Sequence, residues 1–381
     1  MKKVAIASVG VSGFNPTTPD VSYRELTYEA AVKAYNEAGI EPKDIDGFVV
    51  AAEDFCEGYS ISDEYCPDQL GAVLKPVCTV PGDYLHALAT AVMMIRTGVF
   101  KTVVVEGHSK LSNMKNHWSL LGFAMDPVLD RRLGESYRII DGLEMARYLH
   151  ETGTTEEQCA SVVVKFRKAA LKNPLASYGA VLEIEDVIRS DPIAYPLKAL
   201  DVAHPIDGAI VTVLAAEDVI GDLTDKPVWI AGISWYSDSP SFETRELGYS
   251  PATRLAAKKA YQMAGIANPK GQIDLFEISD ETSYKALIHA EELGLCRRGE
   301  AGFLFETGEF GPDGAVKINP SGGELGVGDL FEAKGGHKLY EVVKQLRGEA
   351  GSVQVEGATT GLVHAWRGAP STSCVVAILK V

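Results

Sequence analysis

The sequence predicts an α/β protein made of two duplicated halves, with sheets and helices stacked in five alternating layers. The first reason is that five short segments of residues 1–107 return in the same order after residue 225. The matched segments are 4–7 with 228–231, 33–40 with 259–266, 45–48 with 273–276, 86–96 with 337–347 and 105–107 with 355–357. The second reason is that the helix expected at 84–97 is apolar almost all round from His86 to Ile95, so it must be enclosed by protein. A duplication fixes the architecture and predicts a site between the halves.

Each half is expected to run strand, helix, strand, helix, strand. In the first half we expect strands at 3–9, 45–51 and 102–105, and helices at 23–38 and 84–97. Apolar residues at helical spacing indicate the helix from Tyr23 to Ala38, and Gly39 is placed to end it. The strand from Ile45 to Ala51 is apolar almost throughout, which is typical of a sheet covered on both faces.

The enclosed helix at 84–97 has a counterpart at residues 337–346 in the second half. This counterpart carries Lys338, Glu341 and Lys344. Charged side chains usually mark a helix face that meets water. We therefore expect the second helix to be less enclosed than the first.

Residues 112–200 have no counterpart in the second half and are expected to form an insertion. The predicted domains are therefore 1–225, which contains this insertion, and 226–381. The insertion contains aromatic and methionine residues and a long helical pattern from Thr155 to Leu171. It either covers a pocket or elaborates the surface in a way that aids dimerisation.

The composition restricts the classes of function. The chain has 381 residues, of which 46% are hydrophobic and 23% charged, as is usual for a soluble globular protein. A formal net charge of −16 argues against a nucleic-acid partner, which needs a basic face. No apolar run is long enough for a membrane span, and the residues after Met1 lack the features of a signal peptide. The six cysteines form no C-x-x-C pair, so we expect reduced thiols in the cytoplasm, no metal site and no bound cofactor.

Six motifs spread over almost the whole chain carry a family resemblance. They are Val105–Ser112, Pro205–Ala209, Glu277–Asp280, Gly294–Cys296 with Gly299–Gly302, Asn319–Gly323 and Gln345–Gly351. In this order they resemble the thiolase superfamily, in particular its sterol-carrier-protein-type thiolases and their archaeal and bacterial relatives. The resemblance implies a thiolase-like five-layered fold, acyl-CoA esters as substrates, and a homodimer paired through the strand near 102–105. The reaction does not follow from the fold, because function resides in sites.

The expected site departs from the family pattern at its nucleophile. The resemblance implies a cysteine at the start of the helix 84–97, and counting back from Ile95-Arg96-Thr97-Gly98 places this position at Pro81. A proline side chain cannot attack a thioester. Cys78 lies slightly earlier, where a shifted loop could bring its thiol to the helix N-terminus and favour the thiolate. Alternatively, Cys78 is a small buried residue at the end of a strand.

The candidate bases also differ from the family pattern. The resemblance implies a histidine after the glycine loop, where this chain has Asp329. The loop that is catalytic in the family reads Ser279-Asp280-Glu281-Thr282, and a histidine, His364, is retained near the C-terminus. Carboxylates and imidazoles are the usual groups that move protons in catalysis. Asp280, Glu281, Asp329 and His364 are therefore the candidate bases.

The glycine loop is the candidate for binding the acyl-CoA substrate. Gly322 and Gly323 are adjacent, and paired glycines allow a backbone to approach a ligand closely. Ser321 beside them and Gly82 before the enclosed helix complete the candidate binding residues. The N-terminus of that helix attracts developing negative charge. We expect these residues and the candidate bases to border one pocket between the halves.

Three functions remain open at this point. The first is a thiolase-type acyltransferase with a rearranged site, which forms or cleaves carbon–carbon bonds of acyl-CoA and needs a nucleophile and a base. The second is a lyase that cleaves a β-hydroxyacyl-CoA by a retro-aldol reaction, which needs a base and enolate stabilisation but no acyl-enzyme. The third is a non-catalytic subunit that binds acyl-CoA or scaffolds an active thiolase. Polar residues around the expected pocket favour an enzyme over the third function.

The resemblance also bears on partners. Steroid aldolases that resemble thiolases without the cysteine work with a small partner chain, which consists of a zinc ribbon and an OB fold. The resemblance makes a similar partner plausible for this chain. Neither a nucleic acid nor a membrane is expected as a partner.

Overall fold

The computed structural model describes residues 2–53, 62–114, 122, 125–133, 138–368 and 372–381. Its strands are β1 (Val4–Asn15), β2 (Gly47–Ala51), β3 (Val77–Val80), β4 (Thr102–Ser109), β5 (Pro192–Ala194), β6 (Leu197–Lys198), β7 (Asp207–Ala216), β8 (Val228–Ser237), β9 (Leu275–Glu277), β10 (Phe310–Gly311), β11 (Val316–Ile318), β12 (Thr360–Arg367) and β13 (Ser373–Lys380). Its helices are α1 (Tyr23–Ala38), α2 (Ser62–Tyr65), α3 (Pro67–Leu70), α4 (Tyr84–Arg96), α6 (Arg138–Thr152), α7 (Glu156–Ala170), α8 (Ile184–Ile188), α9 (Pro251–Ala264), α10 (Pro269–Gln272), α11 (Ser283–Glu292), α12 (Ala301–Thr307), α13 (Gly323–Val327) and α14 (Lys334–Arg347).

The same strand order occurs in both halves. In the described part of the chain, the large sheet has 11 strands in the order β10-β11-β9-β12-β13-β8-β1-β7-β4-β2-β3. Outward from the centre, the first half runs β1, β7, β4, β2, β3 and the second runs β8, β13, β12, β9, β11, with matching antiparallel and parallel pairs. The halves meet where Ala5 pairs with Trp229. One topology therefore occurs twice, as the sequence repeats predict, while the domain boundary at 225 and 226 stays a prediction.

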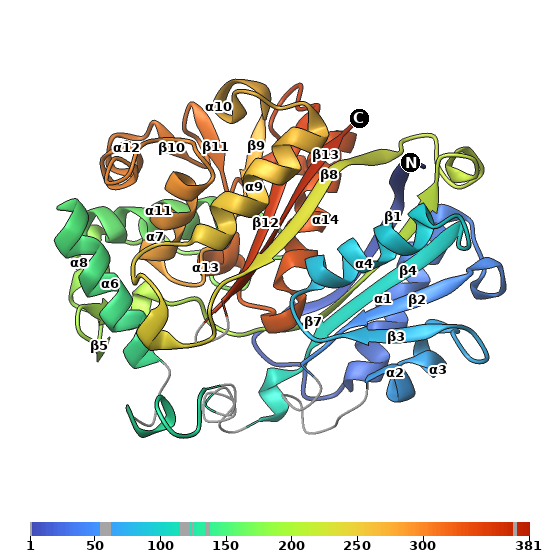
Figure 1. The fold of residues 1–381 in the computed structure, drawn as a ribbon, viewed down its shortest axis with the longest axis horizontal. Helices are drawn as coiled ribbons and strands as arrows, with labels where there is room; N and C mark the ends of the chain where they lie inside the picture. Colours follow the sequence, from blue (N-terminus) through green and yellow to red (C-terminus); the bar gives the residue numbers. More distant parts are fainter. Residues whose placement is uncertain (1, 54–61, 115–121, 123–124, 134–137, 369–371) are drawn as a thin grey trace.

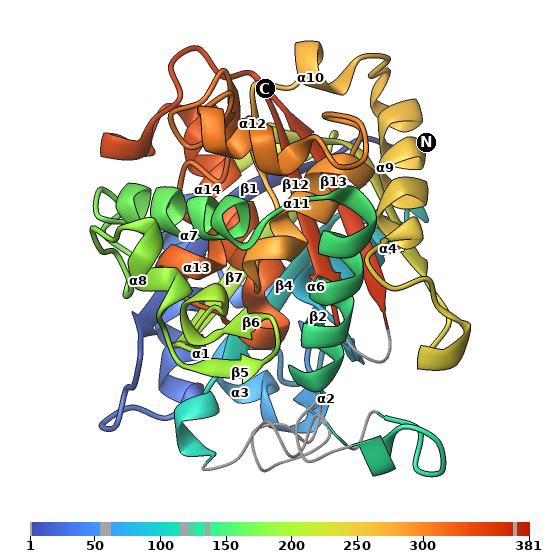
Figure 2. The same cartoon turned by 90° about the vertical axis from the view of Figure 1, so that its left-hand side faces the viewer.

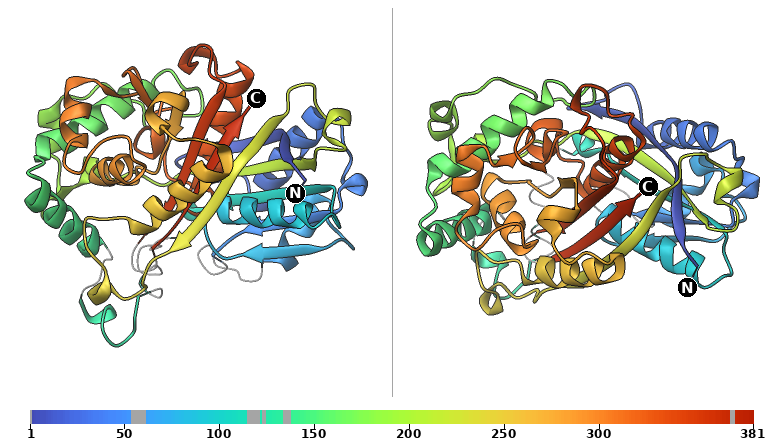
Figure 3. Two further views of the ribbon diagram at one scale, coloured as in Figure 1. Left: turned by 45° about the horizontal axis from the view of Figure 1, so that its top comes forward. Right: turned by 90° about the horizontal axis from the view of Figure 1, so that it is seen from above.

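Three hydrophobic clusters define the helical layers. One cluster includes Leu26 of α1 and covers the outer face of the first half. A second includes Leu88 of α4 and Val342 of α14, together with residues of both half-sheets, and forms the central layer. The third includes Phe166 of α7 and Ala256 of α9 and covers the outer face of the second half. Figures 1 and 3 show the two halves, coloured blue to cyan and orange to red, on either side of the central layer. The predicted five-layered α/β architecture is confirmed.

Local sequence sets both ends of α1. Ser22 and Glu25 form a capping box, in which the Ser22 side chain accepts from Glu25 N–H and the Glu25 carboxylate accepts from Ser22 N–H at 2.7 Å. Gly39 ends the helix with a φ of 61°, a conformation that favours glycine. The predicted bounds of this helix, Tyr23 and Ala38, are confirmed.

Each half needs a glycine where its outer helix crosses its first strand. A Cβ on Gly10 of β1 would lie 2.0 Å from the carbonyl oxygen of Ala30 in α1. A Cβ on Gly232 of β8 would lie 2.4 Å from the carbonyl oxygen of Ala260 in α9. The close helix–strand approach thus repeats in both halves and requires a residue without a Cβ.

The second central helix is more enclosed than the sequence predicts. Lys338 and Glu341 of α14 are buried, whereas Met93 of α4 is 45% exposed. Lys338 pairs with Glu324, and Glu341 accepts a hydrogen bond from Asn173 at 2.8 Å. The prediction of a more exposed second helix was wrong, because its charged residues were taken to mark a helix face exposed to solvent. Their partners come from other elements and keep them in the interior.

One of the repeat matches was misaligned. In strand order, β4 corresponds to β12, but Val355–Gly357 lie before β12 begins at Thr360. The connection from α14 to β12 is longer than that from α4 to β4. The match of 105–107 with 355–357 was therefore wrong, because it paired a strand with a loop.

In the first half, the edge strand of the large sheet is β3. The strand β4 is flanked by β7 on one side and β2 on the other, so both of its edges are paired. The expected pairing of two subunits through the strand near 102–105 is therefore wrong, because β4 has no free edge. A homodimer as such stays a prediction.

The insertion packs against the second half. Its helix α7 packs against α11, α12 and α13, α8 packs against α7, and α6 packs against the hairpin β5–β6 (Figure 2). The helix predicted from Thr155 to Leu171 is confirmed as α7. The aromatic and imidazole residues His117, Trp118 and Phe123 of the insertion lie outside the described residues. Across the described part, no helix is both long and apolar enough to cross a membrane.

Candidate active site

The N-termini of the two central helices lie against each other. Asp83 caps α4 by accepting from Leu85 N–H at 2.8 Å, and its other oxygen accepts from Gly335 N–H of α14 at 2.9 Å. One buried carboxylate thus serves both helix ends, where the helix dipoles favour negative charge. Burial nevertheless raises the pKa of Asp83. The helix junction, as we call it, consists of Gly82, Asp83, His86, Lys334 and Arg367.

His86 and Arg367 meet at the first turn of α4. A Cβ on Gly82 would lie 3.2 Å from His86 Nδ1 and 3.7 Å from a guanidinium nitrogen of Arg367. Nδ1 of His86 is buried and has no hydrogen-bond partner among the described residues. Burial, and then Arg367, lower the pKa of His86 to about 4, so its imidazole is neutral near pH 7. Arg367 in turn pairs with Glu53, just after β2.

A buried ion network extends from the helix junction into the insertion. Glu281 accepts from Lys285 Nζ at 2.6 Å and from Lys334 Nζ at 2.8 Å. Lys285 also donates to Asp141 of α6 at 2.7 Å. Burial alone would raise the pKa of Glu281, but Lys285 and Lys334 outweigh it and hold that pKa well below its usual range. Glu281 is therefore ionised, and both of its oxygens are occupied.

Cys78 lies within a strand and not at the N-terminus of α4. It is in β3, opposite Val49 of β2, and its thiol donates to the carbonyl oxygen of Phe48 at 3.9 Å. Burial, and then Asp63, raise the pKa of the thiol. A nucleophilic cysteine needs the opposite shift. This placement favours the alternative of a partly buried strand residue. A second cysteine of the first half, Cys56, lies outside the described residues.

The glycine loop is packed inside the second half. Ser321 donates to Glu277 through its backbone N–H at 3.0 Å and its Oγ at 2.8 Å. A Cβ on Gly322 would lie 2.6 Å from the Ala170 side chain of α7, and one on Gly323 would lie 2.3 Å from Asp280 Oδ2. The paired glycines therefore let two protein segments approach each other. The described contacts explain them without a ligand.

Asp280 serves as a helix cap. Its two carboxylate oxygens accept from the backbone N–H groups of Glu324 at 2.8 Å and Leu325 at 3.0 Å, in the first turn of α13. Burial, and then Glu324, raise the pKa of Asp280. Although the raised pKa would suit a base, both oxygens already hold hydrogen bonds. We therefore regard Asp280 as a residue that positions the loop.

His364 is fully buried and bonded through both ring nitrogens. Its Nδ1 accepts from Ser279 N–H at 3.4 Å, and its Nε2 lies 3.1 Å from Thr253 Oγ1, to which it donates in this tautomer. The ring of His289 packs edge-on against it at 4.6 Å. Burial, and then His289, lower the pKa of His364 well below its usual range. His364 is therefore neutral and holds the 279–282 loop in place.

Asp329 is the candidate base with a free acceptor. Its Oδ1 accepts from Phe331 N–H at 2.8 Å, and among the described residues this is the one hydrogen bond to its carboxylate, so its Oδ2 is free to accept. Burial raises the pKa of Asp329, although Lys334 of the helix junction opposes this. A carboxylate with a raised pKa and a free lone pair is suited to accept a proton. The loop from Asp329 leads directly into α14 and its Lys334.

Sequence reasoning missed the two lysines of the network. Glu281 and Lys285 have the spacing of neighbours on a helix, which is the one local hint of a pair. Lys334 is 53 residues from Glu281, and only the fold brings them together. His86 begins the repeat match of 86–96 with 337–347, but its place beside Arg367 depends on the contact between the halves.

The fold and the helix junction together define a thiolase-like protein, with two α/β halves whose central helices point their N-termini at one place. Residues 236–380 match the family described as Thiolase C-terminal domain-like. An acetyl-CoA acetyltransferase of Methanothermobacter thermautotrophicus is 32% identical to this chain, over 98% of this chain and 99% of the relative. Sterol carrier protein 2 of Oryctolagus cuniculus is 28% identical over 96% of this chain and 70% of the relative. The chain belongs to the thiolase superfamily.

Solved structures support the same fold. The chain superposes on a structure described as Ltp2-ChsH2(DUF35) aldolase with a TM-score of 0.84 and 26% identity, over 100% of this chain and 98% of that chain. An acetyl-CoA acetyltransferase from Syntrophomonas wolfei gives a TM-score of 0.76 at 17% identity, over 100% of this chain and 99% of that one, which is a likeness of fold alone. The expected superfamily and fold are thus confirmed. The absence of the family's nucleophile and the roles of the site residues stay predictions.

Proposed function

We propose that this protein is an acyl-CoA enzyme that cleaves the Cα–Cβ bond of a β-hydroxyacyl-CoA by a retro-aldol reaction. The observation that carries this proposal is the free oxygen of Asp329, at the position where the family resemblance implies a histidine. The acetyl-CoA acetyltransferase relative supports a CoA ester as the substrate, and the aldolase structure supports carbon–carbon cleavage. Cys78, in β3 with a raised pKa, weighs against an acyl-enzyme.

Asp329 takes the proton of the β-hydroxyl group through its Oδ2. The electron pair of the O–H bond becomes the second bond of a carbonyl at Cβ, and the Cα–Cβ bond breaks. Its electron pair moves to Cα and is delocalised onto the thioester oxygen as an enolate. The protonated Asp329 then returns the proton to Cα, which gives a shortened acyl-CoA and an aldehyde or ketone.

The helix junction would stabilise the enolate. The N-terminus of α4, the Arg367 guanidinium and the Lys334 ammonium all favour negative charge there. Burial opposes the charge of Lys334, but Glu281, Glu324 and Asp329 more than offset this and raise the pKa of Lys334, which keeps it protonated. His86 is neutral and adds no further charge.

A thiolase-type acyltransferase with a rearranged site is the second candidate. The acetyl-CoA acetyltransferase relative, which matches nearly the whole chain, favours it. It would require a cysteine of this chain to carry an acyl group, and Cys78 is the first to examine. A non-catalytic subunit of a thiolase complex is the outcome if neither reaction occurs.

A small partner chain with a zinc ribbon and an OB fold would complete the enzyme. The aldolase structure is named for two components, Ltp2 and ChsH2(DUF35), which supports such an arrangement here. We further propose that the chain forms a homodimer and works in the cytoplasm.

The test is product analysis with a set of β-hydroxyacyl-CoA esters, with and without the partner chain. Mass spectrometry should detect a shortened acyl-CoA and a carbonyl product in equal amounts. Asp329→Asn should lower kcat by about 100-fold or more at an unchanged melting temperature. Asp313→Asn, at a side chain that is 86% exposed, is the matched control and should behave as wild type.

Two results would contradict the proposal. Wild-type turnover by Asp329→Asn would remove Asp329 as the base. No cleavage of any β-hydroxyacyl-CoA by the complete complex would remove the retro-aldol reaction itself.

A further inference from the structure

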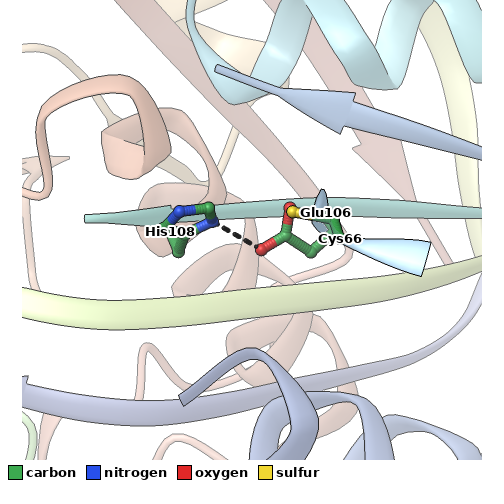
Figure 4. Close-up of side chains that lie close together, drawn as sticks. All are labelled: Cys66, Glu106 and His108. Atoms are coloured by element: carbon green, nitrogen blue, oxygen red, sulfur yellow. Dashed lines mark hydrogen bonds and ion pairs between the residues drawn. The ribbon is translucent and has the colours of Figure 1, made fainter. Parts of the chain in front are cut away.

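Three side chains of the kinds that bind metals converge in the outer layer of the first half. They are Cys66, Glu106 and His108, and one ligand atom of each lies within 4.8 Å of the other two (Figure 4). All three residues are buried, with exposed fractions of 0%, 0% and 1%. We propose that they form a zinc site, which is separate from the helix junction and independent of the proposed reaction.

The strand β4 supplies two of the three ligands. Side chains alternate along a strand, so Val104, Glu106 and His108 point to the same face. Val104 belongs to the outer cluster under α1 and α3, and so does Cys66, which immediately precedes α3. Two polar side chains therefore face an apolar layer. A buried carboxylate in such a place needs a compensating charge.

The hydrogen bonds of Glu106 leave one of its oxygens unused. Oε1 accepts from Thr27 Oγ1 at 2.9 Å and lies 2.9 Å from His108 Nδ1. Oε2 is buried and has no hydrogen-bond partner among the described residues. A metal ion would supply this missing contact and a positive charge.

The ligand set fits zinc by charge and by softness. One carboxylate, one thiolate and one neutral imidazole balance the two charges of Zn²⁺, so the complete site carries no net charge in the apolar interior. Thiolate and imidazole are zinc ligands, whereas magnesium and calcium prefer oxygen. Four-coordinate zinc places its ligand atoms about 3.3–3.7 Å apart. Ligand atoms at the 4.8 Å limit would move closer by roughly 1 Å, and a water molecule would take the fourth position.

Neighbouring residues hold two of the ligands in position. The Tyr23 ring stacks on the His108 ring with a centroid distance of 5.1 Å and an interplanar angle of 17°. Thr27 holds Glu106 through its hydroxyl group. Such contacts around a ligand set orient the ligands toward the ion. The ion would fasten the 62–70 segment to β4, next to the edge strand β3.

The test is the metal content of the chain, produced without a metal-binding tag and without its proposed partner, which would carry zinc of its own. We expect about one zinc per chain by mass spectrometry, and much less in Cys66→Ser and His108→Gln. Cys159→Ser is the matched control, because Cys159 is also fully buried but lies in α7. It should keep the zinc.

Cobalt replacement gives a second readout that does not depend on the stability of the variants. Co²⁺ added to the metal-free wild-type chain should give a thiolate-to-cobalt charge-transfer band, because Cys66 would be a ligand. A folded wild-type chain that takes up neither zinc nor cobalt overturns the proposal, and leaves a metal-free Glu106–His108 contact. Full zinc content in folded Cys66→Ser also overturns it.

Discussion

Lys338→Met tests the view that the buried charge of Lys338 in α14 is structural. Lys338 and Glu324 have side chains that are 0% exposed, and they form an ion pair. Without the ammonium group, the Glu324 carboxylate keeps a hydrogen bond from Ser279 Oγ at 3.1 Å but loses its direct counter-charge. Removal of one partner from a buried pair typically costs about 3–5 kcal/mol. We therefore expect a loss of this size in the free energy of unfolding near pH 7.

The pH dependence of this variant follows from Glu324. Burial alone would raise the pKa of Glu324, but Lys338 and then Lys334 outweigh it and lower that pKa. In the wild type, the stability from this group is present above the unfolded pKa and is lost as the pH falls through the folded pKa. Without Lys338, burial raises the pKa of Glu324 above its wild-type value, although Lys334 still opposes this. The deficit of the variant should therefore shrink in acid and grow as the pH rises.

Urea unfolding followed by tryptophan fluorescence measures this loss, near pH 7 and near pH 5. Lys270→Met is the control, because Lys270 and Glu309 pair at 3.0 Å with both side chains 42% exposed, and its loss should stay below about 1 kcal/mol. Glu324→Gln combined with Lys338→Met should recover much of the stability, since no lone charge is left. A loss below about 1 kcal/mol for Lys338→Met, or an equal loss in the double variant, would refute the reasoning.

Three further predictions concern the fold and the site. Gly10→Ala should lower the free energy of unfolding by about 3 kcal/mol or more in a thermal unfolding assay, because its Cβ would lie 2.0 Å from the Ala30 carbonyl oxygen. Gly221→Ala is the control, because a Cβ there would have no atom within 4 Å, and it should be close to neutral in the same assay. Cys78→Ser should leave kcat unchanged, and a strong loss of turnover would instead assign the thiol to the reaction. The pKa of His86 is lowered to about 4, so the charge of its imidazole should not change between about pH 6 and pH 8. His86→Gln should therefore shift kcat without altering the shape of the pH profile of kcat over that range. A titration near pH 6.5 that is seen in the wild type and disappears in this variant would contradict the lowered pKa.

Local patterns predicted the elements that local interactions determine. The bounds of α1 follow from Ser22, Glu25 and Gly39, all of which lie at its ends. The duplicated topology could be predicted because each half repeats its own apolar segments in order. The misaligned match at 355–357 shows the limit of this approach, since a loop of different length carried the same three residues.

The site depended on contacts that no local pattern encodes. Lys338 resembles a surface charge in the sequence, and its burial follows only from Glu324 on another element. Of the four candidate bases, two are bonded through both oxygens and one through both ring nitrogens, and only Asp329 keeps a free acceptor. Choosing among them required the backbone N–H groups and lysines around them. The sequence identifies these residues as candidate bases but does not show which of them has a free acceptor.

The central claim is that carbon–carbon cleavage proceeds without an acyl-enzyme. The most direct measurement is the intact mass of the chain after an acid quench during steady turnover of a β-hydroxyacyl-CoA, in the presence of its partner chain. We predict an unmodified mass while aldehyde or ketone accumulates together with the shortened acyl-CoA. A chain that carries one acyl group on a cysteine, and that forms this adduct as fast as the enzyme turns over, would contradict the claim and assign the protein to thiolase-type acyl transfer.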